Sequence, residues 1–116
     1  MRTFRSIRAE YARLRGRYYM EAELPLRVPP PVDDPALRWA WITDARLWAA
    51  THFDVDGDPH LVEVPFGQGS RLTCLMILHE LSHMRNPRAV CGRQVWWRAE
   101  GRRLEVAGAF SREGIF

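Results

Sequence analysis

The sequence predicts an α+β domain with an N-terminal helix, a small antiparallel sheet, a buried helix and a C-terminal helix. Three observations predict this order. Apolar residues recur at helical spacing near both ends, alternating apolar and polar residues flank a strong turn signal, and a nearly continuous apolar run occupies residues 72–78. With 116 residues, 47% of them hydrophobic and 27% charged, the chain suits a single domain, residues 1–116, with one modest core.

The N-terminal segment predicts a helix over residues 3–19. Its apolar side chains recur three or four positions apart and arginines occupy positions between them; the apolar ones are Ile7, Tyr11, Leu14 and Tyr18. Residues 23–35 then contain three consecutive prolines, which favour an extended polyproline conformation. We therefore expect this Pro-rich segment to be a stiff connector.

A β-hairpin is predicted by two short runs, Trp48–Asp54 and His60–Pro65. The second run alternates apolar and polar residues, and Asp56-Gly57-Asp58-Pro59 between the runs is a strong turn signal. The alternating aspartates at positions 54, 56 and 58 also resemble the start of a calcium loop. No Glu follows at the twelfth position of such a loop, so we interpret these aspartates as turn residues.

The segment before the hairpin, residues 36–50, is ambiguous. Leu37, Trp41 and Trp48 fit one face of a helix that begins at Asp34-Pro35. Bulky and small residues also alternate over residues 37–41, and Trp-rich short runs are typical of strands. Periodicity therefore leaves both structures open for this segment.

Leu72–Arg85, with the sequence LTCLMILHELSHMR, predicts a helix buried inside the domain. Its first half is almost entirely apolar, as expected for a helix surrounded by other elements of a small domain. Ser70 is the expected N-cap, and Asn86-Pro87 is expected to end the helix. After Pro87 a last helix is predicted by the apolar stripe of Val90, Trp97, Leu104, Ala107 and Phe110.

The buried helix carries His79, Glu80 and His83 in the pattern H-E-x-x-H. Two imidazoles four residues apart project from one face of a helix, so their ring nitrogens can reach one zinc ion. Glu80 can reach a metal-bound water without binding the metal itself. We therefore expect His79 and His83 to bind zinc and Glu80 to be catalytic. The alternative is a buried helix whose histidines only satisfy hydrogen bonds.

A catalytic zinc takes three protein ligands and keeps one position open. Glu100 is our first choice for the third ligand, because it is a carboxylate on the apolar stripe of the last helix. The alternative role for this residue is an ion pair with Arg98 or Arg103. Cys91 is the second choice and Glu105 the third.

The segment LHELSH, preceded by an apolar helix and a hairpin, resembles the zincin metallopeptidases of the minimal gluzincin type, and the SprT-like and YgjP-like families. The resemblance covers about residues 37–105. It implies a strand at residues 37–42 and a three-stranded antiparallel meander, whose edge can bind an extended peptide by strand addition. SprT-like proteins commonly carry His-Gly-x-x-Phe/Trp after the zinc helix, with that His as a ligand. This chain has Cys91-Gly92-Arg93-Gln94-Val95-Trp96 instead.

The resemblance implies a zinc-dependent metallopeptidase that acts on a protein or peptide substrate, with Glu80 as the general base for a metal-activated water. Two alternatives stay open. One is a non-catalytic zinc-binding domain that binds a protein or DNA partner. The other is a latent peptidase whose site is covered by the Pro29–Pro31 segment or by the C-terminal tail.

Charge and hydropathy limit which other functions the chain can have. The net charge is +3, and arginines gather in residues 1–20 and 85–103, each with six Arg and one Glu. Such clusters can contact nucleic acid, although they are more often solvated faces. The chain has no apolar run of about 18 residues, so no membrane span is expected. Neither a secretory signal nor a disulfide framework is present, and we expect a cytoplasmic location.

Overall fold

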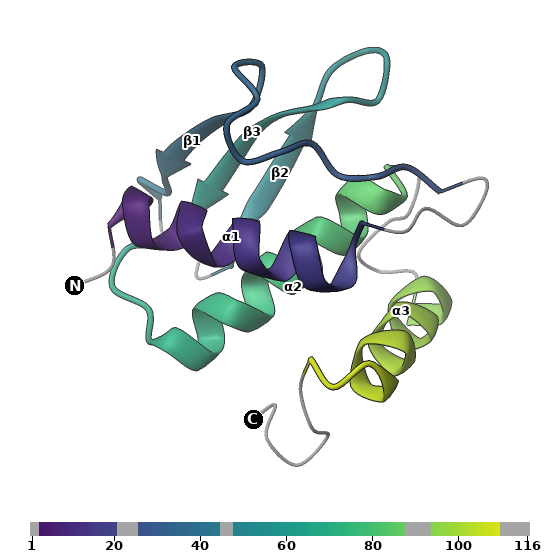
Figure 1. Ribbon diagram of the computed structural model, residues 1–116. Coiled ribbons are helices and arrows are strands. Elements are labelled where there is room, and N and C mark those ends of the chain that lie inside the picture. Colours follow the sequence, from purple (N-terminus) through teal and green to yellow (C-terminus); the bar gives the residue numbers. More distant parts are fainter. Residues whose placement is uncertain (1–2, 21–25, 45–47, 88–93, 110–116) are drawn as a thin grey trace.

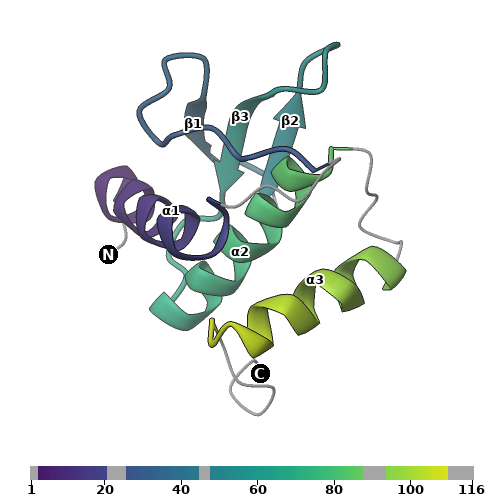
Figure 2. The same ribbon diagram turned by 45° about the vertical axis from the view of Figure 1, so that its right-hand side comes forward.

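A computed structural model of the chain describes residues 3–20, 26–44, 48–87 and 94–109, with the backbone alone for residues 94–99. These residues form an α+β domain, which confirms the predicted class. The elements follow the order α1 (Phe4–Tyr18), β1 (Arg38–Trp41), β2 (Ala50–Phe53), β3 (Pro59–Val64), α2 (Ser70–Arg85) and α3 (Gln94–Val106). Helices α1 and α2 lie on one side of the sheet, and α3 lies beside α2, farther from the sheet (Figures 1 and 2).

The sheet is mixed, with the strand order β1-β3-β2. β2 and β3 form the predicted antiparallel hairpin, whereas β1 pairs with β3 in parallel. The expectation of an antiparallel meander is therefore wrong for β1, although the strand itself lies where it was predicted. A meander requires that successive strands be neighbours. Here the longer strand β3, with Val62 and Val64 buried, takes the central position between β1 and β2.

α1 confirms the predicted N-terminal helix. Thr3 caps it: its hydroxyl oxygen accepts a hydrogen bond from the Ser6 N–H, and the Ser6 hydroxyl oxygen accepts one from the Thr3 N–H. This reciprocal pair satisfies two of the N–H groups that a helix start leaves unpaired. The predicted apolar stripe faces the core, where its buried members are Ile7, Tyr11 and Leu14.

The described part of the Pro-rich connector, residues 26–35, lies along α1 (Figure 1). The Tyr11 hydroxyl donates to the Pro30 carbonyl oxygen over 2.7 Å. The Arg15 Nε donates to the Pro29 carbonyl oxygen over 2.8 Å. Consecutive prolines have no N–H groups, so only their carbonyls can be held, and α1 supplies the donors. These contacts agree with a fixed connector.

α2 passes through the centre of the domain as predicted, but its start differs from the expectation. Gly69, not Ser70, is the N-cap, and no side chain caps this end. The Thr73 hydroxyl, one turn inside the helix, donates to the Gly69 carbonyl oxygen instead. Asn86 ends the helix as expected. The apolar side chains of α2 supply much of the core, with Met76, Ile77, Leu78, Leu81 and Met84 buried.

α3 begins at Gln94 and contacts the core through the predicted stripe, on which Leu104 and Glu100 are buried. Val106, on another face, is exposed. The buried Tyr19, just after α1, donates its hydroxyl to the Leu78 carbonyl oxygen of α2 over 3.1 Å. No helix among the described residues is both long and apolar enough to cross a membrane.

Candidate metal centre

His79 and His83 face each other on α2. Their Nε2 atoms lie 2.9 Å apart, which is the distance of a hydrogen bond, and their ring centroids lie 4.6 Å apart. This contact agrees with the alternative of two histidines that satisfy hydrogen bonds as well as with a pair of metal ligands. Burial, together with the neighbouring His83, lowers the pKa of His79 to about 4, so this imidazole is neutral at pH 7. A neutral imidazole keeps a lone pair for a metal. Two imidazole nitrogens on one helix face fit two of the ligands that zinc prefers.

Glu80 follows His79 on α2, and its side chain is buried. Its side chain is 4% exposed, and Oε2 accepts a hydrogen bond from the Thr51 hydroxyl of β2 over 2.9 Å. Burial raises the pKa of Glu80 to about 7, although the hydrogen bond from Thr51 acts in the opposite direction. A carboxylate with this surrounding can gain and lose a proton near neutral pH, which suits general acid–base chemistry.

Glu100 is held by arginines. Its Oε1 accepts hydrogen bonds from Arg103 Nη2 over 2.6 Å and Nε over 3.3 Å, and it lies 3.8 Å from Arg85 Nε. This is the predicted alternative for Glu100, except that the carboxylate is buried. Among the described residues, no group of three donors that includes both imidazoles has its ligand atoms within 4.8 Å of one another. The structure thus brings the two histidines together without Glu100.

The other two choices for the third ligand have different positions. Glu105 lies on an exposed face of α3. Cys91 lies outside the described residues, as do the next two residues of the segment Cys91–Trp96 that resembles the SprT-like motif. Only the backbone is described for the other three. The identity of a third ligand stays a prediction.

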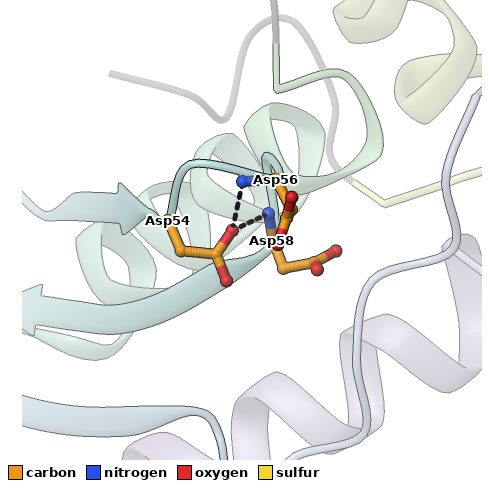
Figure 3. Close-up of side chains that lie close together, drawn as sticks. All are labelled: Asp54, Asp56 and Asp58. Carbon is orange, nitrogen blue, oxygen red and sulfur yellow. Dashed lines mark hydrogen bonds between the residues drawn. The ribbon is translucent and has the colours of Figure 1, made fainter.

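The three aspartates of the β2–β3 turn do bring their carboxylates together (Figure 3). Asp54 Oδ1 accepts hydrogen bonds from the N–H groups of Asp56 and Asp58, each over 2.9 Å. Gly57 between them has φ 81°, a left-handed conformation that favours glycine. Asp58 also pairs with Arg27. Their interpretation as turn residues is confirmed, because the hydrogen bonds hold the turn.

Two residues next to the metal centre were not predicted. Thr51 contacts Glu80, and Trp48 places its ring edge against His79 with centroids 6.0 Å apart. The available signal was the strand alternation, which puts Ala49, Thr51 and Phe53 on one face of the sheet. A polar Thr in that series is unusual, but sequence alone does not tell which helical residue it contacts.

Both arginine clusters make contacts within the chain. Arg8 and Arg15 donate to carbonyl oxygens of the connector, and Arg13 pairs with Glu10 on α1. In the second cluster Arg103 and the buried Arg85 lie at Glu100. These arginines stabilise the packing of the connector and of α3. Contact with nucleic acid stays a prediction.

Comparisons with protein-family models, with curated proteins and with solved structures found no match to this chain. The metal centre is therefore described by its own residues, two facing imidazoles and a buried carboxylate on α2. The resemblance of LHELSH to the zincins remains an inference from the motif.

Proposed function

We propose that this chain is a zinc-dependent metallopeptidase of the zincin type. His79 and His83 bind the zinc, and Glu80 is the general base. The observation that carries the proposal is that His79 and His83 turn their ring nitrogens towards each other on α2, in the part of the helix that also carries the buried Glu80. A buried helix loses stability by carrying three such polar side chains, which favours a role for them in binding or chemistry.

The reaction proposed is hydrolysis of a peptide bond. Zinc, when bound, supplies a Lewis acid that polarises a carbonyl and makes water more acidic. Glu80 accepts a proton from the attacking water at a carboxylate oxygen and then donates it to the leaving amine nitrogen. The carboxylate is thereby regenerated. The chain's own contribution is to hold this carboxylate in place and to shield it from bulk solvent.

An extended protein or peptide segment is the proposed substrate. β2 pairs with β3 along one edge, and among the described strands none pairs with its other edge. Main-chain groups of an open strand edge can bind an extended peptide by strand addition. β2 also contacts the proposed base through Thr51, so a peptide on this edge would lie near Glu80.

A second candidate is a zinc-binding domain without catalytic activity. It is favoured by the engagement of Glu100 with Arg103 and Arg85, because Cys91 is then the next choice of ligand. A thiolate binds zinc well but lowers its Lewis acidity. A domain of this kind would bind zinc and a protein partner but leave peptides intact.

A cleavage assay separates the two candidates. The zinc-loaded chain is incubated with an unfolded protein, and fragments are identified by mass spectrometry. We expect cleavage by the wild type and by Asp33→Asn, a control that removes an exposed carboxylate of the connector. We expect none by Glu80→Gln, which removes the base and leaves both imidazoles. Cleavage by Glu80→Gln at the wild-type rate would refute the peptidase mechanism, and zinc binding without any cleavage would favour the second candidate.

A further inference from the structure

We propose that Thr51 is a positioning residue for Glu80. This inference rests on the proposed function, in which Glu80 is the base. The Thr51 hydroxyl donates to Glu80 Oε2 over 2.9 Å, and it joins β2 to α2 across 29 residues of sequence. The contact holds one carboxylate oxygen and leaves Oε1 to accept the proton of the attacking water.

The surroundings of Glu80 make this hydrogen bond decisive for its orientation. The side chain has three rotatable bonds, and the apolar residues near it in the sequence of α2, Ile77, Leu78 and Leu81, are all buried. Such neighbours exclude water but do not select one direction for a carboxylate. Among the described residues, Thr51 is the hydrogen-bond partner that does so.

The position of Thr51 is itself well determined. It pairs with Val62 in the antiparallel register of β2 and β3, and Val62 is buried in the core. Alternation then directs the Thr51 side chain towards α2, whereas His52 is exposed and pairs with Glu63. Thr is branched at Cβ, so its χ1 angle is restricted and its hydroxyl is held in one direction. The hydroxyl is thus presented to Glu80 by the strand.

A pair of substitutions with a matched control tests this role. Thr51→Val keeps the shape of the side chain and removes the donor, and Thr51→Ser retains the donor. Thr73→Val is the control, because it removes a similar hydroxyl on α2 whose hydrogen bond goes to the Gly69 carbonyl oxygen. We expect Thr51→Val to lower kcat about tenfold or more, with KM and zinc content unchanged. Thr51→Ser should recover most of the loss, and Thr73→Val should keep the wild-type kcat.

A second measurement needs neither zinc nor activity. In zinc-free protein labelled with ¹³C at the glutamate carboxyl groups, the Glu80 signal is assigned by its absence from Glu80→Gln. We expect Thr51→Val to move this signal, and Thr73→Val to leave it in place. A kcat for Thr51→Val equal to that of an active wild type, or an unmoved Glu80 signal, would overturn the proposal for Thr51 alone. A wild type that cleaves nothing would overturn the proposed function, and the catalytic role of Thr51 with it.

Discussion

His79 Nε2 and His83 Nε2 lie 2.9 Å apart on one face of α2, and burial keeps the first imidazole neutral. The adjacent Glu80 is also buried, which raises the pKa of its carboxyl to about 7. Burial therefore lowers the pKa of His79 and raises the pKa of Glu80. Both shifts favour the uncharged form, and each has its own consequence for stability in the zinc-free protein.

The first prediction concerns the free energy of unfolding of zinc-free protein as a function of pH. The pKa of His79 falls from 6.5 to about 4 on folding, so the unfolded chain binds more protons between these values. The stability linked to His79 is present above pH 6.5 and is lost as the pH falls towards 4. The pKa of Glu80 rises from 4.5 to about 7, so the folded chain binds more protons between these values, and stability falls as the pH rises.

The two slopes oppose each other, so we expect a nearly flat wild-type profile between pH 4.5 and 6.5. Glu80→Gln should then show stability that rises with pH, and His79→Gln stability that falls with pH. In each variant the free energy of unfolding should change by about 2 kcal/mol across this pH range, a figure that allows for solvent screening. Urea unfolding at several pH values measures it. Flat profiles in both variants would show that neither shift exists.

The second prediction concerns the ion pair of Glu100. Glu100→Ala removes a buried carboxylate from Arg103 and from Arg85, which is 3% exposed. We expect a loss of about 3 kcal/mol in the free energy of unfolding, because a buried guanidinium group is strongly destabilising when no negative charge lies beside it. Glu105→Ala, at an exposed position of the same helix, should cost less than about 0.5 kcal/mol. Equal small losses in both variants would refute a stabilising role for the ion pair.

The third prediction concerns the third zinc ligand. Because the Glu100 carboxylate forms an ion pair with Arg103, we expect Glu100→Gln to bind zinc within a few-fold of the wild-type affinity. Gln keeps the size of the side chain and an oxygen that can accept from Arg103, and circular dichroism checks that the variant is folded. Competition with a chelator measures the affinity. A folded Glu100→Gln protein that no longer binds zinc would restore Glu100 as the ligand, and loss of zinc from Cys91→Ser would assign Cys91.

Much of the fold follows from local patterns. The spacing of Ile7, Tyr11 and Leu14 predicts α1, the Asp56-Gly57 turn predicts the hairpin, and the apolar run before His79 predicts the buried α2. In each case one segment contains the whole signal. The order of strands does not follow, because the pairing of β1 with β3 depends on which strand takes the centre of the sheet.

The metal centre is predictable to the same extent. His79, Glu80 and His83 lie on one helical turn, so their approach follows from helix geometry. The partner of Glu80 does not follow, because Thr51 is on another element and 29 residues away. For Glu100, the apolar stripe predicts burial correctly, but a buried carboxylate can bind a metal or an arginine. In the structure this carboxylate pairs with Arg103, one turn later on α3, and its role as a ligand stays a prediction.

The central claim is that the two facing imidazoles bind zinc. Titration of the chelator-treated chain with zinc, followed by isothermal calorimetry, tests it most directly. We predict one zinc per chain in the wild type and in Glu80→Gln, and loss of tight binding in both His79→Gln and His83→Gln, each checked to be folded. Tight zinc binding that survives in both histidine variants, or its absence from the wild type, would contradict the claim.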